Sequence, residues 1–395
     1  MYAINHAAAA QNLSIISGGA ATVGLGGYLS GGGHSAISQI YGLAADNVLE
    51  MTVVTPTGEI VTVDDCSNSD LFWALRGGGG GTFGVMVSAT IRAFPSFKYA
   101  VVRVLIGTPS TSVDAFWDGM VEFNSRLPAL ADLGISAYTQ TATALDGSQY
   151  GLPFSVNGVV GLFQLPLLHP SNTTASFTLL VEDLVNGTKV AGGSENGTYW
   201  LSSLTPSEHP DFFTYWKDNN GPENGGQNTV LASRLLDRKV LTSNKAALKS
   251  ALIGAAKSGG ITNHLISGPG VHKFSQNHNS INPAWRKAYI HTVISVRFPP
   301  LDPVGQREQR RLLTDMYLRG LKDLADDGVG SAYVNEGNPD EEEWKEIFWG
   351  ENYERLEKIK RRFDPTGVFW CSRCVGGDWW EEKIRLDGKV RICRT

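Results

Sequence analysis

The sequence predicts an α+β protein in which a mostly antiparallel second domain is inserted between two parts of the first. Two glycine runs, at residues 18–34 and 77–81, are bracketed by short strand-like segments. The chain changes near Pro95 to longer strands and helices, and residues 330–395 form a distinct region rich in aromatic side chains. A chain of 395 residues can bury one large core or two moderate ones.

The N-terminal part is expected to combine short helices with short strands. An amphipathic helix, with Ala3, Ala7 and Ala10 on one face, leads into a strand at 13–16. Further along, the elements expected are a β-hairpin at 48–63 with its Pro-Gly turn at 55–58, a helix at 69–76 capped by Asn68, and an alternating strand at 84–94.

The middle of the chain reads as a second α+β unit. The elements expected are a strand at 99–106, a helix at 112–127, several strands in 134–165, surface loops over 166–230, a strand at 285–298 and a helix at 307–325. In the last part, Asn338, Pro339 and Glu341 predict a capping box, and residues 364–367 end the helix that follows. The aromatic residues of that helix are expected in the core.

The first glycine run indicates a backbone that approaches a ligand. Eight of the seventeen residues from Gly18 to His34 are glycine. Ordering such a run costs chain entropy, so it usually has a steric reason, such as contact with a phosphate or a flat ring. A flexible linker is the alternative. Because apolar strand-like segments bracket both runs, a nucleotide cofactor site is favoured.

Composition argues against several classes of protein. The net charge is −5 and no basic stripe is present, which disfavours a nucleic-acid partner. No apolar run reaches the ~18 residues of a membrane span, and Met1 does not begin a recognisable signal peptide. Four glycosylation acceptor sites nevertheless favour a full-length form in the secretory pathway or outside the cell; they are Asn12, Asn172, Asn186 and Asn196.

The four cysteines predict a disulfide in the C-terminal region. Cys371 and Cys374 are spaced like half a zinc site, but no fourth ligand is evident, so no metal site is predicted. A bond from Cys371 or Cys374 to Cys393, which would hold the C-terminal tail, is expected instead.

Several short motifs follow one another along the chain in a definite order and spacing. They are Thr22-Val23-Gly24, Gly33-His34, Tyr41–Val48, Asp70–Arg76, Gly81–Val85, Tyr333–Glu336, Phe348–Leu356 and Lys360–Pro365. Together they resemble the flavin-dependent oxidases of the vanillyl-alcohol-oxidase type, in particular the berberine-bridge-enzyme-like group of fungi. The resemblance covers about residues 10–95 and 330–375, and the middle of the chain matches only in general character.

The resemblance implies a partial two-lobed FAD-binding domain with an inserted antiparallel-sheet substrate domain. The second FAD lobe would be residues 1–98, the substrate-binding domain 99–329, and residues 330–395 would return to the FAD domain. The family's first lobe, with its Arg-Ser-Gly-Gly-His segment, is expected to be missing from this chain. Without it, the hairpin at 48–63 and the strand at 12–17 are expected to expose apolar surface and to favour aggregation.

The resemblance also implies a reaction. A small-molecule substrate, either an alcohol, a hemiacetal sugar or a specialised metabolite, would pass a hydride to flavin, and dioxygen would reoxidise the flavin. Two alternatives remain: a truncated remnant that cannot hold FAD, and a flavin-bound cyclase without net oxidation.

Cofactor contacts are carried over residue by residue. The residues expected to contact FAD are Thr22, Gly24, Gly26, Gly27, Tyr28, Gly31, Gly32, Gly33, Asn47, Val48 and Val85. Ala20 stands where some relatives carry a flavin-bonded cysteine, and His34 lies in a downstream motif, so noncovalent FAD is expected.

Tyr333 is the candidate catalytic base, and Asn335 would orient Tyr333 or the flavin. A free phenol has a pKa near ~10, so a base at neutral pH needs a lowered pKa or a hydrogen-bonded hydroxyl. Arg286 or Arg297 would supply the lowering charge. His291 would face either the substrate or the core, and the core is favoured.

Overall fold

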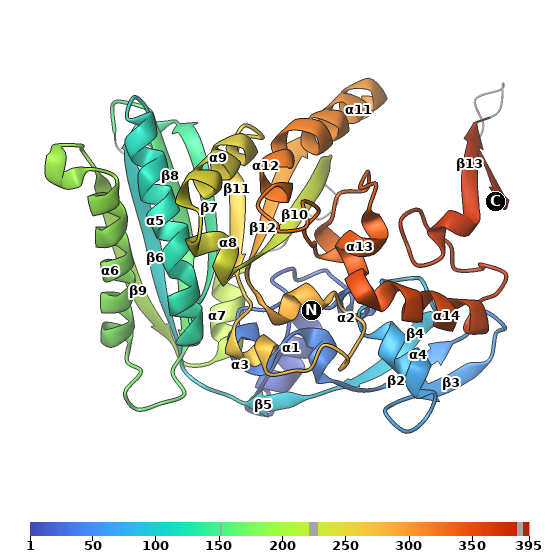
Figure 1. Cartoon of the computed structure of the whole chain (residues 1–395). Coiled ribbons are helices and arrows are strands. Elements are labelled where there is room, and N and C mark those ends of the chain that lie inside the picture. The colour runs from blue at the N-terminus through green and yellow to red at the C-terminus, as the bar shows by residue number, and fades with distance from the viewer. Residues whose placement is uncertain (151, 221–227, 385–389, 395) are drawn as a thin grey trace.

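The computed structural model describes residues 1–150, 152–220, 228–384 and 390–394, and its helices and strands form two regions (Figure 1). One region is a large antiparallel sheet covered by helices, and the other holds three smaller sheets and the N- and C-terminal helices. The predicted α+β class is confirmed. Among the residues described, no helix is long and apolar enough to cross a membrane.

A seven-stranded sheet forms the larger region, and every neighbouring pair of its strands is antiparallel. Its strands, in spatial order, are β10 (Thr229–Asp237), β12 (Ala288–Arg297), β11 (Ile261–Leu265), β7 (Ser136–Leu145), β8 (Val156–Pro166), β6 (Tyr99–Pro109) and β9 (Leu201–His209). The strands expected at 99–106, within 134–165 and at 285–298 are confirmed.

Helices cover one face of this sheet. They are α5 (Val113–Asp132), α6 (Thr174–Ala191), α8 (Arg238–Thr242), α9 (Lys245–Ala256), α11 (Pro303–Leu312) and α12 (Arg319–Lys322), with a π-helical turn, Leu313–Tyr317, between the last two. Except for α11, which buries no residue, these elements contribute apolar side chains to one core with Val102, Phe163 and Ile290 of the sheet. The opposite face is therefore left free of these helices, and it carries the cavities considered below.

The expectation of surface loops over 166–230 is wrong for much of that range. Helix α6, strand β9 and helix α7 (Phe212–Asn219) lie within it. The segment is rich in polar residues, but Phe177, Val181 and Leu184 recur at helical spacing and are buried against the sheet. Most polar residues of α6 face outward, and their number makes the helical spacing of the apolar residues hard to recognise in the sequence.

The N-terminal residues form the second region around two small sheets. Its elements are α1 (Tyr2–Ala9), β1 (Leu13–Ile15), α2 (Leu25–Gly31), α3 (Ser38–Tyr41), β2 (Val48–Val54), β3 (Ile60–Val63), α4 (Ser69–Leu75), β4 (Val85–Ile91) and β5 (Ala93–Pro95). The expected hairpin is confirmed as β2 and β3. Asn68 precedes α4 but does not cap it, because its side chain donates to the carbonyl of Thr62.

The apolar surface expected on the hairpin is present. Leu49 and Ile60 are 45% and 69% exposed, and the adjoining strand β4 exposes Val85 and Val87. The same expectation is wrong for the strand at 12–17. There, Ile15 and Ile16 are buried, since β1 pairs with β5 and packs into the core of this region.

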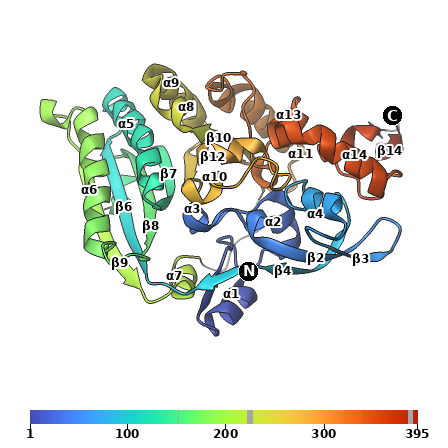
Figure 2. The ribbon, with the colours of Figure 1, turned by 60° about the horizontal axis from the view of Figure 1, so that its bottom comes forward.

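The C-terminal segment returns to the N-terminal region, where α14 (Tyr353–Phe363) lies beside α4 in both orientations (Figures 1 and 2). Its first helix, α13, runs over Trp344–Trp349 and starts later than predicted. Glu341 does not reach back as in a capping box, because it is buried and pairs with Arg234 and Lys322. The aromatic side chains of both helices are core residues, as expected.

The chain ends in a hairpin of β13 (Trp380–Ile384) and β14 (Val390–Arg394). The predicted disulfide partner is wrong: Cys371 bonds to Cys374, and Cys393 is a free thiol. The turn between Cys371 and Cys374 holds their Cα atoms 5.4 Å apart, a normal separation for a disulfide. The remaining short helix, α10 (Pro269–His272), lies against α3.

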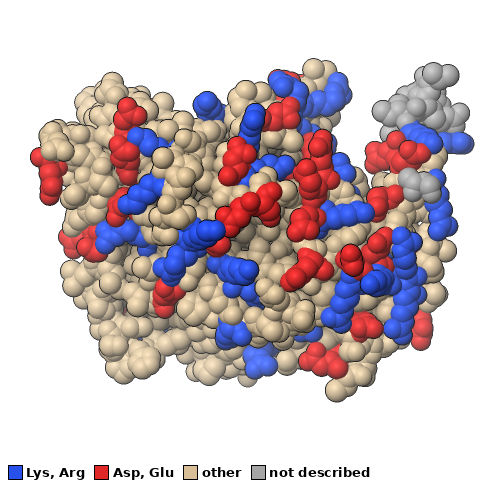
Figure 3. Space-filling view, viewed as in Figure 1, with Lys and Arg blue, Asp and Glu red and all other residues tan. Residues whose placement is uncertain are grey.

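Charges of both signs are mixed over the face that Figure 3 presents, without a basic stripe among its described residues.

A buried ion pair fixes the end of α14. Lys360 Nζ donates to Asp364 Oδ2 at 2.6 Å and to the carbonyl oxygens of Thr82 and Phe369. Burial opposes the ionisation of Asp364, but the hydrogen bonds from Lys360 and from two backbone N–H groups outweigh burial and lower its pKa. The pair therefore ties the C-terminal helix to the second glycine run.

We expect Asp364→Asn to cost about 3–5 kcal/mol of unfolding free energy at pH 7, because it leaves the Lys360 charge buried and unpaired. Since the folded pKa of Asp364 is lowered, its stabilisation is complete above the unfolded value of about 3.9 and is lost below it. In urea unfolding at pH 7, 4 and 3, the difference in unfolding free energy between Asp364→Asn and the wild type should become smaller as the pH falls. Glu308→Gln, at an exposed ion pair, is the control and should change the unfolding free energy little. A difference between Asp364→Asn and the wild type that stayed constant with pH would contradict the role given to the Lys360–Asp364 pair.

Candidate functional site

A cavity of about 800 Å³ lies where the first glycine run meets the uncovered face of the large sheet. The glycine run lines it from Gly18 to Tyr28. His264 and Tyr138 line it from the sheet, and Tyr333, Asn335 and Glu336 from the C-terminal segment. Three parts of the chain that are far apart in sequence thus build one site.

The sheet contributes a row of side chains from neighbouring strands. Residues directly opposite each other in a sheet point to the same face. The register pairs Leu235 with His291, His291 with His264, His264 with Tyr138, Tyr138 with Leu162, and Leu162 with Arg103. This row faces away from the helices, so the sheet registers set the order of the polar groups along the cavity wall.

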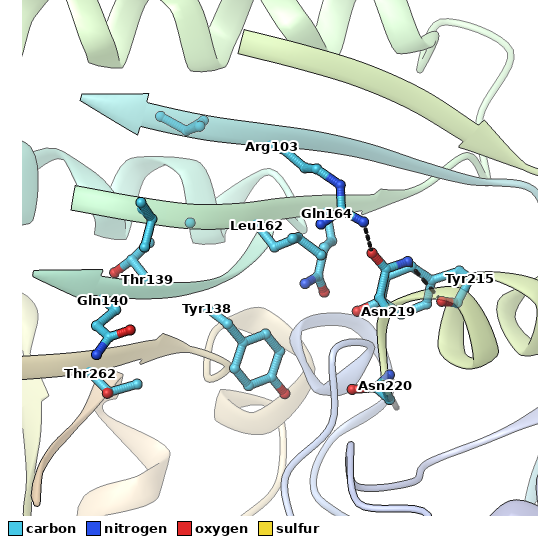
Figure 4. A pocket seen from close by; sticks show the side chains of 13 residues that line it. Arg103, Tyr138, Thr139, Gln140, Leu162, Gln164, Tyr215, Asn219, Asn220 and Thr262 are labelled. Carbon is cyan, nitrogen blue, oxygen red and sulfur yellow. Dashed lines mark hydrogen bonds between the residues drawn. The ribbon is translucent and has the colours of Figure 1, made fainter. Parts of the chain in front are cut away.

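A second cavity, of about 480 Å³, adjoins the first and shares Tyr138 and Asn220 with it (Figure 4). Arg103 is the only charged residue among its described lining residues, and its guanidinium donates to Asn219 Oδ1 at 2.6 Å. The other polar lining groups are amides and hydroxyls, including Gln140 and Gln164. Such a lining suits a ligand that carries many hydrogen-bonding oxygens.

The glycine run fits a ligand that needs close contact with the backbone. A Cβ added at Gly24, Gly26 or Gly27 would meet no protein atom within 4 Å, so the backbone there faces open space. Gly24, Gly26, Gly27 and Tyr28 all line the cavity. An extended, flat cofactor such as FAD can therefore lie along this segment without obstruction by side chains.

The next three glycines lie behind the cavity surface. Gly32 and Gly33 have φ values of +124° and +71°, which glycine adopts readily and other residues rarely do. Their turn aims His34 at the sheet and presents the Gly33 N–H to the hydroxyl of Tyr333 at 3.1 Å. A Cβ on Gly31 would lie 2.3–2.5 Å from the amide of Asn335, so close packing there requires glycine.

Besides these three glycines, four further residues predicted to contact FAD lie outside the lining of this cavity. Thr22 is exposed beside it. Asn47 is buried, and its amide donates to the carbonyls of Tyr41 and Leu43. Val48 is buried at the start of β2, and Val85 is 53% exposed at the start of β4. The structure therefore brings Tyr28 and the glycines near Tyr333, and leaves these four apart from it.

Tyr333 lies at the centre of the site. Its hydroxyl oxygen accepts from the Gly33 N–H and from Asn335 Nδ2 at 2.9 Å. A tyrosine hydroxyl has one donor and room for two acceptor contacts, so both acceptor positions are used. Its O–H is left to donate to a molecule in the cavity. Asn335 also donates to the carbonyl of Gly27, which links Tyr333 to the glycine run.

The expectation that an arginine lowers the pKa of Tyr333 is wrong. Arg286 pairs with buried Asp46 instead, and Arg297 lies at the exposed end of β12. Burial raises the pKa of Tyr333 above its ordinary value, the charge of Glu336 raises it further, and the hydrogen bonds from Asn335 and Gly33 only partly offset this. In this structure Tyr333 is a protonated donor at neutral pH.

Beside Tyr333, three imidazoles surround one carboxylate. The ring centroids of His34, His264 and His291 are 5.3–5.7 Å apart. Glu336 Oε1 lies 3.3 Å from His34 Nε2, and Oε2 lies 3.6 Å from His291 Nδ1. We call these four residues the His-Glu cluster. His291 is fully buried, as expected, but it faces this cluster rather than an apolar core.

Burial decides the charge of two of these rings. It lowers the pKa of His264 to about 4 and that of His291 to about 3, against the opposing charge of Glu336. Burial would raise the pKa of Glu336, but the hydrogen bond from His34 and the adjacent imidazoles hold it well below its ordinary value. At pH 7 the cluster therefore contains an ionised carboxylate beside neutral His264 and His291.

The four residues of the His-Glu cluster are not recognisable as a unit from the amino-acid sequence. His264 and His291 are separated by 26 residues, a spacing that matches no short metal-ligand motif. Only the pairing of β11 with β12 makes them neighbours. Glu336 was within the Tyr333–Glu336 motif but received no role. A three-residue helical turn, Val334–Glu336, brings its side chain to the same side as that of Tyr333.

Comparison with known proteins points to flavoproteins. Residues 1–64 match the family described as FAD binding domain, and residues 332–375 match the family described as berberine and berberine like. The VAO-type flavoprotein MtVAO713 from Myceliophthora thermophila C1 is 26% identical and superposes with a TM-score of 0.85, over 99% of this chain and 67% of that one.

Curated relatives carry similar names. An uncharacterized FAD-linked oxidoreductase of Arthroderma benhamiae is 34% identical over 95% of this chain. The FAD-linked oxidoreductase patO of Aspergillus clavatus is 31% identical over 99% of it. The chain spans 63% and 64% of the lengths of these two relatives.

We expect Gly31→Ala to destabilise the protein by about 1–3 kcal/mol, because its Cβ would overlap the amide of Asn335. Removing that amide in the double variant Gly31→Ala/Asn335→Ala should recover part of the loss, and a double-mutant cycle measured by urea unfolding would quantify the coupling.

Gly254→Ala is the matched control, because Gly254 lies within helix α9 and a Cβ there meets no atom within 4 Å. It should be neutral or stabilising by up to about 1 kcal/mol. Purely additive effects of the two site substitutions would contradict the packing described.

Proposed function

We propose that this chain is an FAD-linked oxidoreductase of the VAO-type, berberine-like group that it resembles, and that it oxidises a small oxygen-rich molecule. The substrate class is an alcohol, a sugar hemiacetal or a specialised metabolite. The substrate carbon gives up a hydride and its hydroxyl a proton, which leaves a carbonyl. Dioxygen is the final acceptor of the two electrons and becomes hydrogen peroxide.

The residues that would hold FAD are those of the glycine run that line the cavity, from Gly24 to Tyr28. Bound FAD supplies the two-electron acceptor for the hydride. The chain contributes an unobstructed backbone, while buried Tyr28 closes the site from behind and donates to the carbonyl of His34. We propose that the cofactor is held without a covalent bond, since Ala20 offers no nucleophile at the cavity wall.

One observation carries the proposal: the amide of Asn335 donates both to the Gly27 carbonyl and to the Tyr333 hydroxyl. Since Gly27 lines the cofactor side of the cavity and Tyr333 has a free O–H, this amide sets the position of the donor relative to the cofactor. Such positioning, made before the substrate arrives, is what hydride transfer needs from the protein.

Tyr333 donates its O–H to the reacting oxygen of the substrate. Its two acceptor contacts hold the hydroxyl in one orientation, and Trp285 packs against its ring at 5.7 Å between centroids. Tyr333 was expected to be the base, but because its pKa is raised by burial and by the charge of Glu336, it acts here as a hydrogen-bond donor with its own proton in place. The adjoining cavity, with Gln140, Gln164 and Asn220, would hold the rest of an oxygen-rich substrate.

A route through the secretory pathway is part of the proposal. Asn12, Asn186 and Asn196 are exposed, so glycosylation at these sites meets no steric obstacle.

The proposal is tested by the visible absorption spectrum of the purified chain with and without added FAD. We expect a bound flavin spectrum, and release of the flavin into the supernatant after acid precipitation. A protein that stays colourless with excess FAD would overturn the proposal, and colour that stays with the precipitate would overturn its noncovalent form.

We expect Tyr333→Phe to lower kcat/KM by about 10²–10³-fold, since it removes one preorganised donor to the reacting oxygen. The measurement is oxygen uptake and peroxide formation with a panel of alcohols and sugars. The flavin spectrum should be retained, which separates lost chemistry from lost cofactor. Tyr199→Phe, at an exposed tyrosine, should match wild type; equal rates for all three proteins would contradict the role of Tyr333.

A further inference from the structure

We propose that the His-Glu cluster, His34, His264, His291 and Glu336, is a binding site for a divalent transition-metal cation of the zinc class. This site lies beyond the proposed oxidation, which needs FAD but assigns no metal. Three imidazoles and one carboxylate form a donor set suited to zinc, cobalt, nickel or iron, and unlike the all-oxygen sets that hold magnesium or calcium.

The geometry is close to that of a coordination sphere. One ligand atom from each of the four residues can be chosen so that all lie within 4.8 Å of one another. A tetrahedral site with bonds of about 2.1 Å has ligand atoms about 3.4 Å apart. The separation of 3.3 Å from Glu336 Oε1 to His34 Nε2 and that of 3.6 Å from Glu336 Oε2 to His291 Nδ1 are each close to that value.

The hydrogen bonding of the cluster is incomplete without a further partner. His34 Nδ1, His264 Nδ1 and both ring nitrogens of His291 are buried and have no hydrogen-bond partner. Buried polar atoms in proteins are nearly always satisfied, so unpaired ones need an explanation. His291 is 0% exposed and its ring faces the other three residues. A cation accepts the lone pairs that these imidazoles present.

Rigid elements hold the ligands. His264 and His291 are directly paired on β11 and β12, which are the third and second strands from one edge of the seven-stranded sheet. The Gly32-Gly33 turn supplies His34, and the helical turn after Tyr333 supplies Glu336. Sites on strands hold their geometry well, because packing restricts the side chains.

The cluster is accessible from the cavity. His34, His264 and Glu336 line it, while His291 closes the cluster from the sheet side. A cation can therefore enter from the cavity, and the free side of its coordination sphere would face the space in which the substrate is proposed to bind. With Glu336 ionised, the bound site would carry a net charge of about +1, which suits an oxygen ligand from that space.

The test is metal binding by the whole chain after treatment with a chelator. Titration calorimetry with Zn²⁺ should show one site per chain with a Kd below about 1 μM. Co²⁺ should bind there with visible absorption bands that Zn²⁺ abolishes, whereas Mg²⁺ should not compete. Neither readout requires flavin or turnover, so the result is independent of the proposed oxidation.

Glu336→Gln and His264→Gln are the diagnostic variants and should weaken Zn²⁺ binding at least about 100-fold. Glu336→Gln keeps the size of the side chain, so it is the variant with the better prospect of folding, and circular dichroism would verify this. His169→Gln, at an exposed histidine, is the matched control and should bind like wild type. Absence of a one-site isotherm, or equal binding by all four proteins, would overturn the proposal.

Discussion

The hydroxyl of Tyr333 is the point on which the site depends. It accepts from a backbone N–H 300 residues earlier in the chain and from the side chain of Asn335 two residues later. These contacts are buried, so leaving one unmade would cost the desolvation of its donor. The glycine turn and the C-terminal segment are thereby held against each other, and the distances across the cavity follow from that contact.

The surrounding packing reinforces this arrangement. Gly31 must be glycine because the Asn335 amide occupies the space of its Cβ. Further from the cavity, Arg286 makes two hydrogen bonds to buried Asp46, which joins the N-terminal segment to the loop before β12. Trp349 donates to the carbonyl of Gly77 in the second glycine run. Both glycine runs are thus anchored by side chains from later in the chain.

Two kinds of chemistry meet at the cavity. On one side is a glycine-lined wall with open space at Gly24, Gly26 and Gly27, which fits a flat cofactor. On the other is a polar wall, with the row of His291, His264 and Tyr138 on the sheet. Tyr333 lies between them, so a substrate that contacts its hydroxyl is within reach of both walls.

The amino-acid sequence by itself determined the class of the fold, the hairpin at β2 and β3, and four strands of the large sheet, β6, β7, β8 and β12. These follow from local patterns and short motifs, which act over a few residues. Helix α6 was missed because its polar outward positions outnumber the apolar ones that pack on the sheet.

Only the tertiary structure decided the pairing of Cys371 with Cys374. It also decided the contact of Asn335 with Gly27 and the meeting of His34, His264, His291 and Glu336. For His264 and His291 the physical reason is strand order and register, and neither is encoded in the spacing of residues along the chain. For the other groups it is the packing of turns that lie outside the large sheet. The tertiary structure also decides the raised pKa of Tyr333, because only folding buries its hydroxyl and brings it close to the charge of Glu336.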